Sequence, residues 1–225
     1  CASSELAPGR ASSMPLAGLQ PTNDHPDEFH TIASALATAG WCVVPDLLTP
    51  EQTRALAAEC RALHAAHQLT PARVGAARTA TPLRGDSTRW FEPGAMSAAQ
   101  QAFADRLDAL RLAFNRELML GLVECESHYA VYPPGAGYAR HLDRLRDSDA
   151  RLVSAVFYLN EGWQEADGGA LRLYVDGGSH HDDFPHAGPL LLLLSAQFEH
   201  EVLPATRDRL SIACWMRQRK LVPTF

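Results

Sequence analysis

Histidine and aspartate recur in this chain at a spacing that could bind a metal ion. The pattern His-x-Asp occurs at four places: His25/Asp27, His141/Asp143, His180/Asp182 and His181/Asp183. On a β-strand the side chains at i and i+2 point to the same face, so both could reach one ion. Because the chain has 10 histidines, the pattern by itself identifies no site, and the surrounding sequence must distinguish the four pairs.

The surroundings favour the second pair. The first pair flanks a proline at an expected helix start, where capping and the helix dipole explain an acidic residue. The segment 180–183 is polar and flanked by glycines, which predicts a solvated turn. It is also too close in sequence to His200 for several strands to intervene. His141 and Asp143 follow a Pro- and Gly-rich turn and precede a clear strand, so they are best placed for a metal site.

A later strand offers a third ligand. His200 lies in an alternating stretch, and Arg209 follows across a short turn. The next strand would return beside His200 and place the guanidinium deeper in a barrel. A buried arginine needs a carboxylate partner, and its fork suits a dicarboxylate co-substrate. The same spacing also occurs at His64 and Arg73, so only its combination with His-x-Asp is informative.

Two histidine nitrogens and one carboxylate oxygen on one face of an octahedron leave three coordination positions free. This arrangement is the facial triad of non-haem Fe(II) oxygenases. His141, Asp143 and His200 therefore predict an open iron site, and Arg209 predicts an anchor for a co-substrate beside it.

The elements that would carry these residues are helices first and strands afterwards. A helix is expected over Pro26–Ala39, with Gly40 as its stop. Thr49 and Gln52 form a capping box that begins a second helix, expected to run as far as His67. A third helix begins at Ser97.

After residue 120 the hydrophobic pattern alternates, which predicts short strands. They are expected at 126–132, 138–143, 152–159, 170–175, 189–194, 199–203 and 209–216. Helices followed by many short strands predict an α+β fold with a double-stranded β-helix (jelly-roll) core and N-terminal helices packed on one sheet.

Composition limits the domain organisation and the partners. Residues 1–24 are rich in Ser, Ala, Pro and Gly, which predicts a flexible N-terminal arm, and 25–225 are expected to form a single domain. The net charge of -6 predicts no nucleic-acid partner. The longest apolar run is too short to span a membrane, so no membrane partner is expected. Five cysteines without a CxxC pair argue against a disulfide framework and a zinc ribbon, and favour a cytoplasmic protein.

Further motifs surround the triad. They are Gly40–Val44, Arg84-Gly-Asp86 with Trp90, Gly137–Asp143, Tyr158–Asn160, Gly168–Leu173, and His200 with Arg209 and Trp215. From Gly40 onward the chain resembles the prolyl 4-hydroxylase branch of the 2-oxoglutarate oxygenases, above all the hydroxylases that act on hypoxia-inducible factor and their bacterial relatives. The Arg-Gly-Asp element with its tryptophan is the branch-specific part.

The resemblance implies roles for individual residues. His141, Asp143 and His200 would bind Fe(II); Arg209 and Tyr158 would hold the distal carboxylate of 2-oxoglutarate, Tyr132 would lie near its metal-bound end, and Trp215 would wall the pocket. Without the resemblance, Tyr158 and Trp215 are equally well explained as barrel core. Ala213 stands where the related oxygen sensors tend to carry a hydroxyl residue, which leaves details of co-substrate binding open.

The resemblance also implies a substrate entrance. Arg84, Asp86, Trp90 and Arg151 match positions there, and an Asp86–Arg151 ion pair is expected. The segment 68–88 is expected to be a loop that closes over a protein substrate, the alternative being a plain flexible connection.

The implied activity is protein prolyl 4-hydroxylation with Fe(II), 2-oxoglutarate and O2, which releases succinate and CO2. Ascorbate is a further expected cofactor, and the expected partner is a protein with a target proline, elongation factor Tu if the source is bacterial. The enzyme is expected to be a monomer. Two alternatives are an oxygenase acting on a free amino acid, another small molecule or nucleic acid, and a non-catalytic jelly-roll binding protein. The acidic charge, the arginine-bearing loop and the intact triad argue against these.

Overall fold

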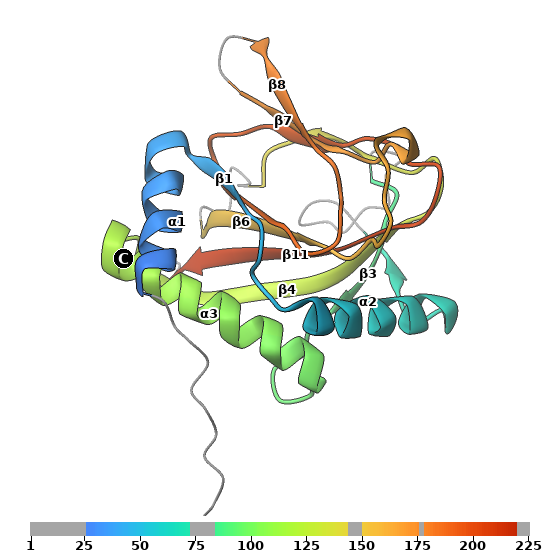
Figure 1. The fold of residues 1–225 in the computed structure, drawn as a ribbon, viewed down its shortest axis with the longest axis horizontal. Helices are drawn as coiled ribbons and strands as arrows, with labels where there is room; N and C mark the ends of the chain where they lie inside the picture. Colours follow the sequence, from blue (N-terminus) through green and yellow to red (C-terminus); the bar gives the residue numbers. More distant parts are fainter. Residues whose placement is uncertain (1–25, 73–83, 144–149, 176–177, 220–225) are drawn as a thin grey trace, which may run out of the picture.

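The computed structural model of the protein describes residues 26–72, 84–143, 150–175 and 178–219. The expected arm at 1–24 and the central part of the expected substrate loop, 73–83, lie outside the described residues. Two sheets form the two layers of a double-stranded β-helix, and the helices pack on the outer side of the larger sheet (Figure 1). The predicted α+β jelly-roll architecture is therefore confirmed.

All strand pairings within the two sheets are antiparallel. The larger sheet has the order β1-β9-β6-β11-β4-β3-β2. Its strands are β1 Trp41–Val44, β9 Leu190–Leu194, β6 Arg151–Tyr158, β11 Arg209–Gln218, β4 Leu122–Tyr132, β3 Ser87–Trp90 and β2 Thr70–Pro71. The smaller sheet has the order β5-β10-β7-β8. Its strands are β5 Tyr138–His141, β10 His200–Val202, β7 Leu171–Tyr174 and β8 His180–Asp183.

Three α-helices and one short 3-10 helix complete the described fold. They are α1 Pro26–Ala39, α2 Pro50–Ala65, α3 Ala98–Leu118 and the 3-10 turn Glu165–Asp167. The predicted capping box begins α2, because the Thr49 side chain accepts from the Gln52 N–H and Gln52 accepts in return. The helix ends two residues before the predicted His67, which adopts a left-handed φ of 55° while the next N–H bonds to Leu63 O.

Gly40 ends α1 as predicted, for two reasons. Its φ is +76°, and a Cβ at this position would lie 2.7 Å from the Phe198 ring. Only glycine meets both demands without strain. The helix can therefore turn directly into β1 beside the inner layer of the barrel.

The leucine run of β9 is buried on both faces because the helices cover one face of the larger sheet and the smaller sheet covers the other. Leu190 and Leu192 belong to the main core under the helices, which also holds the predicted inward face of α3. Leu191 and Leu193 pack between the sheets against Leu171 and Leu173. Full burial of one such side chain stabilises the fold by about 1.5–3 kcal/mol.

The prediction of a solvated turn at 180–183 is wrong. These residues form β8, which pairs with β7 along its full length. The alternation of β8 directs His181 and Asp183 to the inner face, while Asp182 pairs outside with Arg172 at 2.8 Å. Polar composition misled the prediction because an edge strand of a sheet accepts charged side chains on its solvent face.

No helix in the described part of the chain is long and apolar enough to cross a membrane.

Candidate active site

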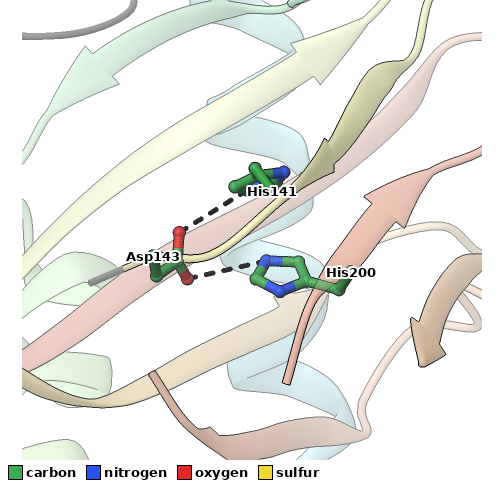
Figure 2. A group of neighbouring side chains, drawn as sticks. All are labelled: His141, Asp143 and His200. Carbon is green, nitrogen blue, oxygen red and sulfur yellow. Dashed lines mark ion pairs between the residues drawn. The ribbon is translucent and has the colours of Figure 1, made fainter. Parts of the chain in front are cut away.

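His141, Asp143 and His200 point toward one another (Figure 2) and line one cavity. His141 ends β5, and the β10 register places His200 directly opposite it. Asp143 lies just beyond β5, because this strand ends at His141, two residues short of the end that the sequence predicted. Its carboxylate oxygens are 3.6 Å from His141 Nε2 and 3.6 Å from His200 Nε2. The possible ligand atoms all lie within 4.8 Å of one another, so one ion could contact all three.

Backbone carbonyls orient both imidazoles. His141 Nδ1 lies 2.8 Å from Ala139 O, and His200 Nδ1 lies 3.2 Å from Phe198 O. With Nδ1 protonated and donating, Nε2 keeps its lone pair toward Asp143. This is the usual support of a metal-binding histidine.

The ionisation states of the three groups suit a divalent cation. Burial lowers the pKa of His200, which favours the neutral imidazole that binds metals. Burial alone would raise the pKa of Asp143, but its contacts with His141 and His200 outweigh it and hold that pKa below its usual range. A carboxylate and neutral imidazoles are the donors of a facial triad.

Arg209 lines the same cavity as the three possible metal ligands. It begins β11 opposite Tyr132 of β4 and is 1% exposed. Its Nε donates to Gly169 O at 2.7 Å, and its Nη1 donates to Ser211 Oγ at 3.3 Å. Its buried Nη2 has no hydrogen-bond partner among the described residues.

An orphaned guanidinium N–H is costly in a buried site unless a ligand satisfies it. Gly169 allows the close approach of Arg209, because a Cβ there would lie 3.4 Å from Arg209 Cδ and 2.9 Å from the Ala205 side chain. The three possible metal ligands and the unpartnered Arg209 N–H that share this cavity together fit Fe(II) and a dicarboxylate such as 2-oxoglutarate.

The other predicted co-substrate residues lie around this cavity in different ways. Tyr132 and Trp215 line it, and the buried Trp215 Nε1 has no partner among the described residues. Tyr158 lies beside Arg209, whose Cζ is 5.4 Å from the tyrosine ring centroid. The Tyr158 hydroxyl, however, donates to Asp183 Oδ2 at 2.8 Å. The predicted role of Tyr158 toward the co-substrate therefore remains a prediction.

The expected ion pair between Asp86 and Arg151 is not formed. Asp86 accepts two hydrogen bonds from Arg84, at 2.6 and 2.9 Å, and its side chain is 0% exposed. Arg151 instead crosses the Trp215 face, 3.8 Å from that ring centroid, and donates to Glu126 at 2.6 Å. The register of β6, β11 and β4 decides this, because Trp215 is directly opposite Glu126.

Of the predicted entrance residues, only Arg84 is among those that line the cavity. Arg84 lines it and lies 4.9 Å over the Tyr138 ring. Trp90 is 45% exposed and packs its edge against His128, with ring centroids 4.6 Å apart. An exposed tryptophan beside a lined cavity is a natural contact for an apolar group.

Two further cavity residues were missed from the sequence. Tyr138 stacks on His141 with ring centroids 3.7 Å apart, and His128 is 1% exposed with a pKa that burial lowers to about 4. Both line the cavity. His128, Ala130 and Tyr132 share one face of β4, so counting back from Tyr132 in steps of two residues could have identified His128.

Comparison with known proteins agrees with the geometry. A family model described as the 2OG-Fe(II) oxygenase superfamily matches residues 127–217. Egl nine homolog 1 from Homo sapiens is 31% identical over 78% of this chain and 43% of its own length. The chain spans about half the length of the curated relatives of this kind from human, rat and mouse.

Two solved structures extend the comparison. A Pseudomonas putida prolyl-4-hydroxylase is 47% identical, with a TM-score of 0.79 over 85% of this chain and 100% of that chain. A Trichoplax adhaerens prolyl hydroxylase in complex with a hypoxia inducible factor peptide fragment is 25% identical, with a TM-score of 0.80 over 86% and 90%. The resemblance read from the motifs is thus confirmed.

Proposed function

Because the chain belongs to the 2OG-Fe(II) oxygenase superfamily and is homologous to prolyl hydroxylases, we propose that it is a protein prolyl 4-hydroxylase. It uses Fe(II), 2-oxoglutarate and O2 to hydroxylate a prolyl residue of a protein, and it releases succinate and CO2. The observation that carries the co-substrate part is the orphaned Arg209 Nη2 in the same cavity as the triad.

Each side chain has a distinct task in this proposal. His141, Asp143 and His200 hold the iron, which when bound supplies the activation of O2 and the transfer of oxygen to a C–H bond. Arg209 fixes the distal carboxylate of the co-substrate through its fork. Tyr132 and Trp215 wall the co-substrate and exclude water from it.

We propose a protein substrate because of the side chains at the cavity and next to it. Trp90 exposes an apolar surface next to the cavity, and Arg84 and Tyr138 form its other edge. A prolyl ring fits an aromatic rim of this kind, and the flanking chain could extend over Arg84 and Arg151. The related proteins named as prolyl hydroxylases support the same substrate class.

The test is prolyl-peptide-dependent turnover of the purified full chain. Succinate release with Fe(II), 2-oxoglutarate and ascorbate is expected to rise when a prolyl peptide or elongation factor Tu is added, and mass spectrometry is expected to find one oxygen atom added to a proline. His141→Ala is expected to abolish both signals. Turnover that responds to free amino acids and never to peptides would instead identify a small-molecule oxygenase.

We also propose a cytoplasmic, monomeric enzyme. The described cysteines Cys42, Cys60, Cys125 and Cys214 are all unpaired, as suits a reducing compartment. Sedimentation of the purified chain at assay concentration tests the monomer, and a stable dimer would contradict it.

A further inference from the structure

Asp183 is a partly buried acidic group with a contact that the proposed reaction does not use. It lies on β8, at the edge of the smaller sheet, directly opposite Leu171. Its side chain crosses the barrel to accept a hydrogen bond from the Tyr158 hydroxyl of the larger sheet at 2.8 Å. The contact joins the two layers of the barrel.

The same tyrosine borders the proposed carboxylate position. Arg209 Cζ lies 5.4 Å from the Tyr158 ring, and Arg209 Nη1 donates to Ser211, which is paired with Tyr158 in the sheet. A carboxylate on the orphaned Nη2 would therefore come close to the Tyr158 hydroxyl. In the structure, the Tyr158 hydroxyl donates its single hydrogen to Asp183.

A phenol has a single O–H hydrogen and otherwise only acceptor lone pairs. If Tyr158 keeps donating to Asp183, it presents lone pairs to an incoming carboxylate. If it turns its hydrogen to the co-substrate, the Asp183 carboxylate loses its donor in a partly buried place, which costs free energy. Asp183 and a dicarboxylate thus require the same hydrogen.

We propose that Asp183 is a positioning residue that competes with the co-substrate for the Tyr158 hydroxyl hydrogen, and so weakens 2-oxoglutarate binding in a pH-dependent way. This inference rests on the proposed co-substrate site at Arg209. Protonated Asp183 can donate to the tyrosine oxygen, which frees the phenolic hydrogen for the co-substrate. Affinity for the dicarboxylate therefore rises as Asp183 takes up a proton.

The groups around Asp183 determine its pKa. Burial raises the pKa of Asp183, whereas the Tyr158 hydrogen bond and the charges of His181, Arg209 and His186 lower it in turn. The net effect is that the pKa of Asp183 is raised above its usual value. His181 lies on β8 itself, His186 on the following loop and Arg209 on β11, so these are the other groups whose titration or charge must be held constant.

The experiment is calorimetric titration of 2-oxoglutarate into the manganese-loaded full chain, which measures binding without turnover. Asp183→Asn is expected to tighten binding roughly three- to tenfold near neutral pH, because the Asn amide donates to the tyrosine oxygen and frees its hydrogen. Asp182→Asn is the matched control. It removes the same charge from the neighbouring residue, which faces outward to Arg172, and is expected to leave the Kd unchanged.

Tyr158→Phe separates competition for the hydrogen from a direct effect of the Asp183 charge on Arg209. In the Tyr158→Phe background, Asp183→Asn is expected to change the Kd no further. A persistent tightening there would overturn the proposal in favour of plain electrostatics. An unchanged or weaker affinity of the single Asp183→Asn variant would overturn it as well.

A pH series supplies a test that does not depend on the folding of the Tyr158→Phe variant. The ratio of the wild-type Kd to the Asp183→Asn Kd is expected to fall toward one as pH is lowered, because Asp183 of the wild type then takes up a proton and no longer competes for the Tyr158 hydrogen. A constant ratio would contradict the proposal. If the wild-type protein binds no 2-oxoglutarate at all, the proposed co-substrate site fails too, which distinguishes that failure from the failure of the Asp183 competition alone.

Discussion

Two His-x-Asp pairs lie at the two edges of the same four-stranded sheet. His141 and Asp143 belong to the β5 edge, and His181 and Asp183 belong to β8 at the other. Both pairs turn toward the barrel interior, yet they meet different neighbours. His141 is opposite His200 of β10, whereas His181 is opposite Leu173 of β7.

The neighbouring strand therefore decides what a His-x-Asp pair does. Beside β5, His200 completes a group of three possible metal ligands. Beside β8 there is no third ligand in the described residues, so His181 packs on Trp41 with ring centroids 4.6 Å apart and Asp183 accepts from Tyr158. The same His-x-Asp spacing therefore supplies possible metal ligands at the β5 edge and packing contacts at the β8 edge.

The largest expected difference between the edges is in metal binding. His141→Ala removes one of three ligands and is expected to lower iron affinity and turnover by about 100-fold or more, since even the loss of a supporting residue costs 10–100-fold. His181→Ala is expected to bind iron as the wild type does. The iron content of both variants after desalting measures this difference. An equal loss of iron in the two variants would refute the assignment of the metal site to the β5 edge.

Arg209 lines the cavity of the first pair, and its charge acts on Asp183 of the second pair, so its removal tests the proposed co-substrate anchor. Arg209→Ala is expected to raise the KM for 2-oxoglutarate by about 10- to 100-fold, which corresponds to a lost charged hydrogen bond. Arg207→Ala, on the same turn with a half-exposed side chain near Asp167, is the matched control. Steady-state succinate release measures both, and an unchanged KM in Arg209→Ala would exclude the proposed anchor.

The β8 histidine is expected to matter for stability only modestly. His181→Ala loses the ring contact with Trp41, and the free energy of unfolding is expected to fall by about 0.5–1.5 kcal/mol. Urea unfolding followed by tryptophan fluorescence measures the change. A loss of several kcal/mol would mean that β8 contributes far more to the barrel than this one contact.

The smallest expected effects separate the two aspartates of β8. The Arg172 hydrogen bond lowers the pKa of Asp182, so its stabilisation is present at neutral pH and is lost as pH falls through the folded-state pKa. Asp182→Asn is expected to cost at most about 1 kcal/mol near neutral pH. Burial raises the pKa of Asp183, so its charged form is a penalty that disappears in acid.

Asp183→Asn is therefore expected to increase stability near neutral pH, opposite in sign to Asp182→Asn. Both differences from the wild type are expected to shrink as pH is lowered. Unfolding midpoints in urea across an acidic to neutral series measure them. Effects of the same sign would contradict the assignment of inner and outer faces on β8.

Most elements of the fold could be predicted because their signals are local. Thr49 with Gln52 marks the start of α2, and Gly40 marks the end of α1, through hydrogen bonds and dihedral angles set within a few residues. The strand β8 was missed because its signals are not local. Its charges are compatible with an edge strand, and pairing with β7 rather than composition makes it one.

The metal triad was predictable for a related reason. Alternation predicts that His141 and Asp143 face one side of a strand. The predicted return of Arg209 beside the strand of His200 is wrong, because β10 pairs with β5 and β7, whereas β11 lies in the other sheet between β6 and β4. Arg209 still lines the same cavity, from the opposite sheet. The partners of Asp86 and Arg151 were not predictable in this way. Arg84 is two residues from Asp86, but whether it or Arg151 pairs with Asp86 depends on how β6 and β11 align.

By itself, the sequence determined which residues could bind iron and a dicarboxylate, the order of helices and strands, and the family of the chain. Only the tertiary structure decided that His200 faces His141, that Arg209 keeps one N–H free, and that Tyr158 donates to Asp183. Side-chain types and periodicity are properties of neighbouring residues. Strand register and contacts across a barrel arise from distant segments, whose alignment is decided by packing over the whole core.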